Sequence, residues 1–354
     1  MTDAITEIAE LEHWHPVALS DELGSEPLGV RLLDQELVVY RTASGRVAAL
    51  GDVCPHRRMR LSLGHVRGER LVCKYHGWSF ASDGRGESHG QPRRHACATS
   101  LEAVERHGAV WVRTRNAPSR FPEFDTDGFD PIAPIVHTIE APLEVVLDNF
   151  IEVEHTGTTH AALGYDPDRM NEVETSIEAD ADSFSVHNVG PQKPLSWPMR
   201  MLFGVKPGDH FVDDWTTRFS PVHAVYDHFW RDPETQALRH DHLRTYVFFV
   251  PTNATTTRLF SFIFARSRHP LRSRFIPSLG PVITWVADRE VNLDRVMIES
   301  LADKSPDIKG MRLGRFDRPL GEARKRLASI YRTAPSVGLG DTSDPPPDEA
   351  HAES

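Results

Sequence analysis

Ionisable residues crowd the segment Asp148–His160, DNFIEVEHTGTTH, which contains two histidines. In an α-helix, Asp148, Glu152 and His155 would stack on one face. His160 would lie off that face, and the intervening Thr-Gly-Thr-Thr is a weak helix former that lets the chain turn. Two imidazoles and one carboxylate suit a divalent iron with positions open for oxygen. The alternative is a solvated acidic helix with incidental histidines, and this segment alone favours neither.

A second group of candidate ligands lies earlier in the chain. Cys54 and His56 form a Cys-x-His pair, and after a further sixteen residues Cys73 and His76 form a Cys-x-x-His pair. Two thiolates and two imidazoles could hold a tetrahedral zinc ion. They could equally hold a Rieske cluster, in which the cysteines bind one iron and the histidines the other. The spacing leaves both metal centres open.

The residues around these four positions favour the Rieske cluster over zinc, because they resemble a known family. The stretch CPHRRMRLSLGHVRGERLVCKYHGWSFASDGRG resembles the Rieske domain of the aromatic ring-hydroxylating oxygenases. The resemblance implies that Cys54, His56, Cys73 and His76 bind a 2Fe-2S cluster. Cys97 lies outside the motif, and we expect it to be a small buried apolar residue.

The second half of the chain resembles the same superfamily. An acid three residues before His155, and a second histidine five residues after it, match the mononuclear-iron motif of these non-heme iron oxygenases. The resemblance implies that His155 and His160 are iron ligands. It also implies a third ligand from the C-terminal helix, where LDRVMIES places Asp294 ahead of Glu299; Asp288 is the alternative.

Three further residues receive roles from the resemblance, which is closest to the dicamba and vanillate O-demethylase oxygenases. Glu152 is expected to hydrogen-bond both His155 and the cluster ligand His76 of a neighbouring subunit. These demethylases usually carry Asp there, so the longer Glu could change the reach. Asn149 is expected near the iron, or else is a local polar residue of the helix. Trp285 is expected to border the substrate pocket, with a core tryptophan as the alternative.

Composition excludes several classes of protein. The chain has 354 residues, enough for two domains, and a net charge of −11 that argues against binding nucleic acid. No apolar run is long enough to span a membrane, and the N-terminus lacks the pattern of a signal peptide. We therefore expect a cytoplasmic protein. Three cysteines are unsuited to a disulfide framework there.

The pattern of elements predicts an α+β fold with two domains. Short apolar runs to residue 112 read as strands of an all-β Rieske domain, residues 1–118, followed by a Pro- and Asp-rich linker, residues 119–134. Residues 135–333 should form a mononuclear iron catalytic domain: a helix over about 141–155, long antiparallel strands over 175–267 forming a helix-grip-type sheet, and C-terminal helices. Residues 334–354 are expected to be disordered.

Several basic and imidazole residues fall on the predicted long strands. They could line a pocket for an anionic substrate, or they could be the solvent-facing half of alternating strands; they are Arg218, His223, His228, His240, His242 and Arg244.

These features predict the terminal oxygenase component of a multicomponent Rieske monooxygenase. It would use O₂ and electrons from NAD(P)H through a separate reductase, with or without a ferredoxin, because the chain has no dinucleotide-binding GxGxxG turn of its own. It would hydroxylate or demethylate a small organic, aromatic substrate, and by analogy it would form a homotrimer. A cis-dihydroxylating dioxygenase and a non-catalytic Rieske electron carrier are the alternatives.

Overall fold

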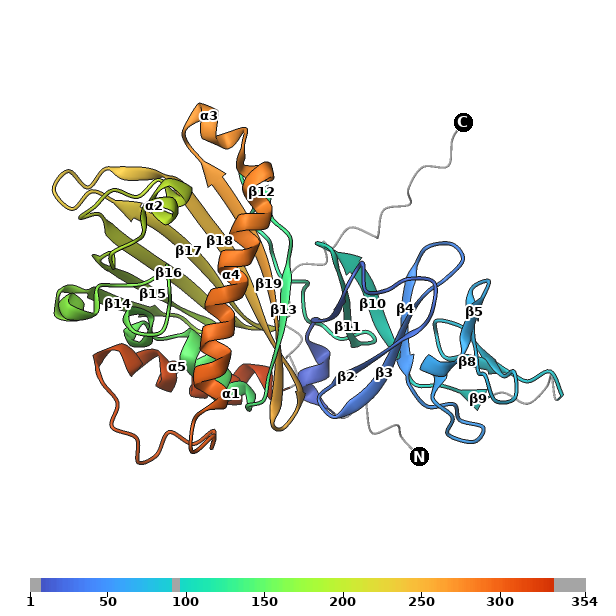
Figure 1. The fold of residues 1–354 in the computed structure, drawn as a ribbon. Coiled ribbons are helices and arrows are strands. Elements are labelled where there is room, and N and C mark those ends of the chain that lie inside the picture. The colour runs from blue at the N-terminus through green and yellow to red at the C-terminus, as the bar shows by residue number, and fades with distance from the viewer. Residues whose placement is uncertain (1–7, 91–95, 334–354) are drawn as a thin grey trace.

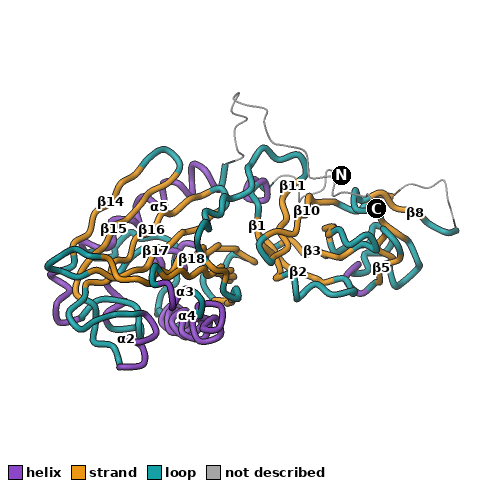
Figure 2. The backbone as a smooth tube through the Cα atoms, turned by 90° about the horizontal axis from the view of Figure 1, so that it is seen from above, coloured by secondary structure: helices purple, strands orange, loops and turns teal. Residues whose placement is uncertain are grey.

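Three antiparallel sheets build the protein, and the computed structural model describes residues 8–90 and 96–333 of the chain. An eight-stranded sheet carries helices on one face, as Figures 1 and 2 show from two directions. The six-stranded sheet lies beside it, and the five-stranded sheet lies farthest from the long helix α4 (Figure 1). The predicted disordered tail, residues 334–354, lies outside the described residues.

The six-stranded sheet comes from the N-terminal part of the chain and has the strand order β1-β11-β10-β4-β3-β2. A 3₁₀ turn, η2 (Ala9–Glu12), precedes it. Its strands are β1 (His15–Leu19), β2 (Leu28–Leu32), β3 (Gln35–Arg41), β4 (Val47–Gly51), β10 (Ser100–Arg106) and β11 (Ala109–Thr114). Its apolar side chains share a core with aromatic residues of the larger sheet, and this core joins the two domains. Trp111 of β11, for example, packs against Phe248 and Phe262 of the larger sheet.

The five-stranded sheet is inserted between β4 and β10. It follows the short turn η3 (Leu61–Leu63) and runs in chain order through β5 (His65–Arg67), β6 (Arg70–Val72), β7 (Ser79–Phe80), β8 (Arg85–Glu87) and β9 (Ala96–Cys97). Leu61, Leu71 and Phe80 are completely buried and pack on β3 and β4. The all-β N-terminal region predicted from the sequence is confirmed.

The eight-stranded sheet is the antiparallel sheet expected over 175–267. Its strands are β12 (Asp130–Pro131), β13 (Ile135–Ile139), β14 (Glu174–Ala179), β15 (Ser183–Pro191), β16 (His210–Phe219), β17 (Val222–Arg231), β18 (Leu238–Asn253) and β19 (Thr256–Ser267). Successive strands from β14 to β19 pair as antiparallel neighbours, and a turn at Ser220-Pro221 connects β16 to β17.

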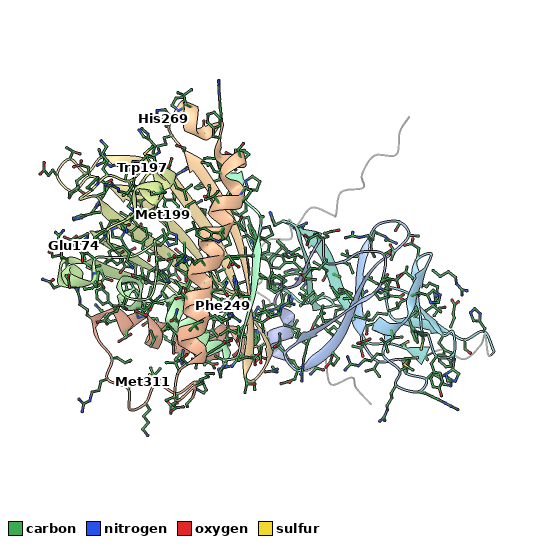
Figure 3. All side chains as sticks on the ribbon, viewed as in Figure 1. Glu174, Trp197, Met199, Phe249, His269 and Met311 are labelled. Carbon is green, nitrogen blue, oxygen red and sulfur yellow. The ribbon has the colours of Figure 1, made fainter. Side chains whose placement is uncertain are left out.

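Helices cover the face of this sheet turned away from the first domain. They are α1 (Leu143–Phe150), α2 (Trp197–Phe203), α3 (Pro270–Ser273), α4 (Ile276–Glu299) and α5 (Arg318–Arg326), with a π-helical turn η7 (Leu327–Tyr331) after α5. Phe249 of β18 (Figure 3) packs edge-to-face on Phe150, with ring centroids 5.6 Å apart. This contact fixes the end of α1 against the sheet.

The predicted helix over 141–155 was too long. The α-helix ends at Phe150, and Ile151 already has φ −118° and ψ 21°. The Ile151 N–H donates to the carbonyl of Asp148, only three residues earlier, which ends the α-helical hydrogen-bond pattern. The chain therefore leaves the helix here and forms a short 3₁₀ turn, η4 (Glu154–Gly157).

Candidate metal centres and the cavity beside them

The four candidate cluster ligands lie on two loops that have the same backbone hydrogen bonds. The carbonyl of Cys54 accepts from Arg58 N at 2.8 Å, and the carbonyl of Cys73 accepts from Gly77 N at 3.0 Å. Each cysteine N–H donates in turn to the residue five positions later, at 2.8 and 2.7 Å. Arg58 and Gly77 both have positive φ, 57° and 71°, which turns each loop back on itself. The loops therefore present their cysteines and histidines in matching ways.

The loops bring the thiols together in the interior and the imidazoles together near the surface. Cys54 and Cys73 are 1% and 2% exposed, while the rings of His56 and His76 have centroids 4.6 Å apart. Burial raises the pKa of the Cys54 thiol to about 11, and the neighbouring Cys73 adds to the increase. Two buried thiols need a cation to become thiolates, so this donor set fits an iron–sulfur cluster.

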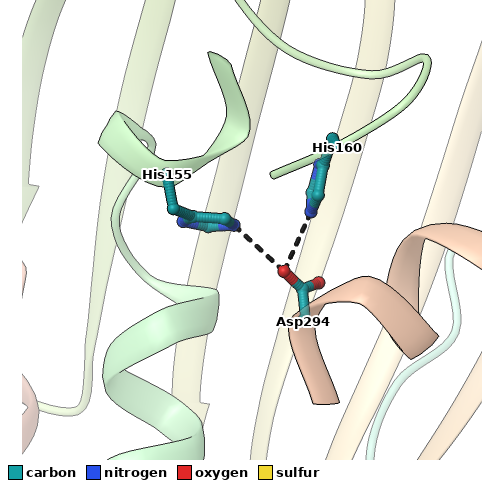
Figure 4. Close-up of side chains that lie close together, drawn as sticks. All are labelled: His155, His160 and Asp294. Carbon is teal, nitrogen blue, oxygen red and sulfur yellow. Dashed lines mark hydrogen bonds and ion pairs between the residues drawn. The ribbon is translucent and has the colours of Figure 1, made fainter. Parts of the chain in front are cut away.

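The second candidate centre joins residues that are far apart in the chain. Nε2 of His155 and Nε2 of His160 lie 3.2 and 3.0 Å from the same Asp294 oxygen, Oδ1, as Figure 4 shows. One ligand atom from each residue lies within 4.8 Å of the others. Nε2 of His155 is buried and has no well-directed hydrogen bond among the described residues. Two imidazoles and a carboxylate around one point fit a mononuclear non-heme iron.

In both imidazoles, Nδ1 contacts an acceptor oxygen of the protein. Nδ1 of His155 contacts the Glu152 carboxylate, and Nδ1 of His160 lies 3.1 Å from the Leu163 carbonyl. Each partner accepts the Nδ1 proton and so leaves Nε2 free to bind a metal. Burial lowers the pKa of His155, but its contacts with Asp294 and Glu152 outweigh burial and raise the pKa to about 10. A metal cation at Nε2 would replace that proton.

Glu290, which was not predicted, holds the loop that carries His160. It lies one helical turn before Asp294 on α4 and is 4% exposed. Its carboxylate accepts backbone N–H groups from Ala161 at 3.1 Å, Ala162 at 3.2 Å and Leu163 at 3.4 Å. The i, i+4 spacing of two acids on one helix was the sequence signal that could have identified it.

Lys193 also fixes this loop. Its ammonium donates to the carbonyls of Thr156 at 2.9 Å and His160 at 2.5 Å, and burial lowers its pKa. The chain passes so close to itself at Gly164 that a Cβ atom there would lie 2.7 Å from the Thr156 carbonyl. No local sequence pattern relates Lys193 to the histidine motif.

The other acids of the two motifs have different partners. Asp288 points in a different direction from Asp294: its half-exposed carboxylate is 3.0 Å from Nε2 of His137. Asp148 pairs with Arg324 through two contacts of 2.8 and 2.5 Å. Asp294 is therefore the acid that meets both histidines.

A cavity of about 120 Å³ opens beside His155, His160 and Asp294. It lies between α1, α4 and the inner face of the eight-stranded sheet, and its walls are mostly apolar; they include Phe150, Leu163, Phe203, Val247, Ile263 and Ile283. Its volume is of the same order as the ~150 Å³ cavity that admits benzene. A larger hollow, about 780 Å³, lies on the opposite face of the sheet and includes none of these three residues.

Three predicted positions have mixed outcomes. Asn149 lines the cavity, and its place near the iron stays a prediction. Trp285 does not: it is 56% exposed on the outer side of α4 and belongs to a surface groove with Phe275 and Met201, so neither the pocket position nor the core position is found. Cys97 is exposed on the edge strand β9 rather than buried.

Among residues 8–90 and 96–333, no helix is long and apolar enough to cross a membrane.

Known proteins match the N-terminal domain and most of the chain. A sequence model of the Rieske [2Fe-2S] domain matches residues 13–104. The vanillate O-demethylase oxygenase subunit of Pseudomonas sp. (strain HR199 / DSM 7063) is 29% identical over 228 residues, 60% of this chain and 63% of that protein. The dicamba O-demethylase oxygenase component of Stenotrophomonas maltophilia is 28% identical over 305 residues, 81% of this chain and 86% of that protein.

The same fold occurs in a solved structure. The crystal structure of dicamba monooxygenase bound to 3,6-dichlorosalicylic acid superimposes with a TM-score of 0.77 at 22% identity, over 92% of this chain and 98% of the other. The chain spans less than two thirds of the vanillate relative and more than four fifths of the dicamba relative. It therefore contains a Rieske domain, is homologous to the oxygenase components of vanillate and dicamba O-demethylases, and has the fold of a Rieske oxygenase.

Proposed function

We propose that this chain is the terminal oxygenase component of a multicomponent Rieske monooxygenase. It takes electrons from a separate NAD(P)H-dependent reductase, with or without a ferredoxin, and uses O₂ to hydroxylate or oxidatively demethylate a small aromatic substrate. The cytoplasmic location expected from the sequence is part of this proposal.

One observation carries the proposal. His155, His160 and Asp294 converge beside an apolar cavity, in a chain whose other domain matches the Rieske domain. A simple electron carrier has no use for a second donor set, or for a cavity next to it. The arrangement instead provides a place to bind an organic molecule against a metal with open positions.

In this proposal the residues of the chain position, insulate and adjust the two centres. Cys54, His56, Cys73 and His76 hold the cluster, and His155, His160 and Asp294 hold Fe(II). The bound metals supply stored electrons and O₂ activation. For a methyl ether, two electrons and two protons from the donor and solvent accompany insertion of one oxygen atom into a C–H bond, and the other atom leaves as water. The resulting hemiacetal then releases formaldehyde.

Glu152 is the proposed link between centres. Its carboxylate holds the Nδ1 proton of His155, and 14% of the side chain remains exposed. Within one chain, the sheet β5–β9 that frames the cluster loops lies beyond the six-stranded sheet, away from α1 and α4 (Figure 1). We therefore propose a homotrimer in which the exposed His76 of one subunit approaches Glu152 of the next.

The test is substrate-dependent NADH consumption with a generic reductase, screened over methoxylated aromatics, aromatic acids, amines and alicyclics. With isotopically labelled O₂, the proposal requires one labelled atom in the hydroxylated product, or in the released formaldehyde when a methyl group is removed. Two labelled atoms would instead indicate a cis-dihydroxylating dioxygenase. Protein that retains only cluster iron after careful reconstitution, and that turns over no substrate, would favour a non-catalytic electron carrier.

A further inference from the structure

Three buried polar groups on the cavity walls have no hydrogen-bond partner among the described residues. They are Nε1 of Trp215, Nδ2 of Asn149 and Oγ of Ser261; Trp215 also borders the larger hollow on the opposite face of the sheet. Trp215 and Ser261 are 3% and 1% exposed. A buried donor without a partner costs roughly 1–3 kcal/mol. Because an indole N–H and an amide NH₂ can only donate, both call for an acceptor atom on the molecule that fills the cavity.

Strand pairing shows which polar residues are neighbours of Trp215 in the cavity wall. Trp215 of β16 pairs with Tyr226 of β17, and the next inward-facing pair along the strands is Asp213 with His228. The Tyr226 hydroxyl is already used, because it donates to the Phe150 carbonyl. His228 is also used, through the 3.1 Å contact of its Nε2 with the Asp213 carboxylate. The indole N–H of Trp215 is therefore the unpaired donor of this row.

The charged residues around the cavity are mostly acidic. Four carboxylates line it, from Glu152, Asp213, Glu290 and Asp294, and no lysine or arginine appears among its described lining residues. The imidazole of His228 is held by Asp213, which offsets its charge when it is protonated. Arg218, Arg244 and the imidazole of His223 line the large hollow on the opposite face of the sheet instead.

We propose that the substrate is an uncharged, single-ring molecule with a hydrogen-bond acceptor, which the indole N–H of Trp215 receives with help from Asn149, and that carboxylate substrates are excluded by Asp213. This inference rests on the proposed function and specifies its substrate class.

The exclusion follows from solvation. A carboxylate loses its water on entering an apolar cavity, and only a cation or several donors can repay that cost. Apart from the proposed Fe(II), whose charge Asp294 partly offsets, the described lining residues supply no lysine or arginine for this purpose. Here the approaching anion would meet the fixed carboxylate of Asp213 on the floor of the cavity. A neutral carbonyl oxygen needs one donor, and the cavity has that donor unpaired.

Three probes of nearly equal shape separate the effect of the carbonyl acceptor from the effect of the negative charge. 3-Methoxyacetophenone is neutral and has a carbonyl acceptor, 3-methoxybenzoate is its anionic counterpart, and 3-isopropenylanisole has the same outline without the carbonyl acceptor. Binding of each to the metal-loaded protein is measured by calorimetry, which needs no turnover. We expect the ketone to bind about ten times more tightly than 3-isopropenylanisole, about 1.4 kcal/mol, and the benzoate to bind least.

Two variants assign the effects to residues. Trp215→Phe keeps the aromatic wall and removes the N–H, so ketone binding should weaken about tenfold while 3-isopropenylanisole changes little. Asp213→Asn removes the charge at similar size, so benzoate binding should strengthen about tenfold. Trp197→Phe is the matched control, because Trp197 is 68% exposed on α2 (Figure 3) and does not line the cavity.

The outcomes separate this inference from the proposed function. Benzoate binding as tight as ketone binding in the unmodified protein, or no ketone binding in the millimolar range, overturns the inference even if other substrates are oxidised. An unchanged ketone affinity in a folded Trp215→Phe protein, with normal cluster absorbance, also overturns it. Trp215-dependent ketone binding without any oxygen consumption supports the inference and counts against the oxygenase function.

Discussion

Replacing Glu290 by glutamine tests whether the loop after His160 depends on a carboxylate. Both oxygens of Glu290 lie within 3.3 Å of the N–H groups of Ala161 and Ala162, and Oε2 also accepts from Leu163 N at 3.4 Å. Glutamine is nearly the same size, but it replaces one acceptor oxygen by an NH₂ group. That group would face backbone donors at a site where the side chain is 4% exposed.

The size of the effect follows from these contacts. A hydrogen bond to a charged group contributes roughly 1.5–3 kcal/mol, and glutamine keeps a neutral carbonyl for at most part of the set. We expect Glu290→Gln to lower the free energy of unfolding by about 2–4 kcal/mol. Losing an interaction that orients a metal ligand typically costs about 10–100-fold in metal affinity, so mononuclear iron should be lost first.

The assay is iron per protein after dialysis against a weak chelator, together with cluster absorbance and the thermal midpoint. Glu290→Gln should keep the cluster and lose the additional iron. Glu299→Gln is the matched control, because Glu299 lies on the same helix and accepts a single backbone N–H, from Glu140 at 3.1 Å. If both variants retain equal iron and equal thermal midpoints, Glu290 does not position His160.

Three more predictions follow from individual side chains. Asp294→Ala should lose mononuclear iron and keep the colour of the cluster, whereas Asp288→Ala should keep both metals; metal analysis giving the reverse result would reassign the ligand. Glu152→Gln should keep both metals but lose substrate oxidation coupled to NADH, and unchanged turnover would remove it as the link between centres. Burial lowers the pKa of His223 from 6.5 to about 4, so the unfolded state binds the extra proton between those values and stability falls on acidification through that window. A His223→Gln protein should show a pH slope of unfolding free energy smaller by about 1.4 kcal/mol per pH unit near pH 5, and an equal slope would contradict this.

Contiguous motifs and strand patterns were the parts of this protein that the sequence predicted well. The cluster loops are short, and the backbone hydrogen bonds of Cys54 and Cys73 close within five residues, so local sequence contains the information they need. The antiparallel sheet followed from alternating apolar residues between turn signals. The contact of His160 with Asp294 joins residues 134 positions apart, and only resemblance to known oxygenases suggested it.

Helical geometry explains the outcome for Trp285. Nine residues separate it from Asp294, which is about 2.5 turns of an α-helix, so the two side chains leave α4 on opposite sides. Glu290, four residues from Asp294, is on the same side and lines the cavity. The position of Trp285 could therefore have been obtained by counting turns along the predicted helix. The end of α1 could not, because no glycine or proline follows Phe150 before Gly157 to mark it.

Predicting which residues line the cavity requires the register of the strands, which composition does not provide. Six basic or imidazole residues were candidates for binding an anion, but inward positions alternate along each strand. On β17, Tyr226 and His228 face the cavity, so His223 must face the other side. On β16, Trp215 faces inward and Arg218 outward by the same alternation. A shift of one residue in β16 would turn Arg218 toward the cavity face and Trp215 out of the cavity. The charge of the molecule that this cavity accepts therefore depends on strand register. Register brings the unpaired indole N–H and the Asp213 carboxylate into the cavity, and binding measurements can detect the effect of each.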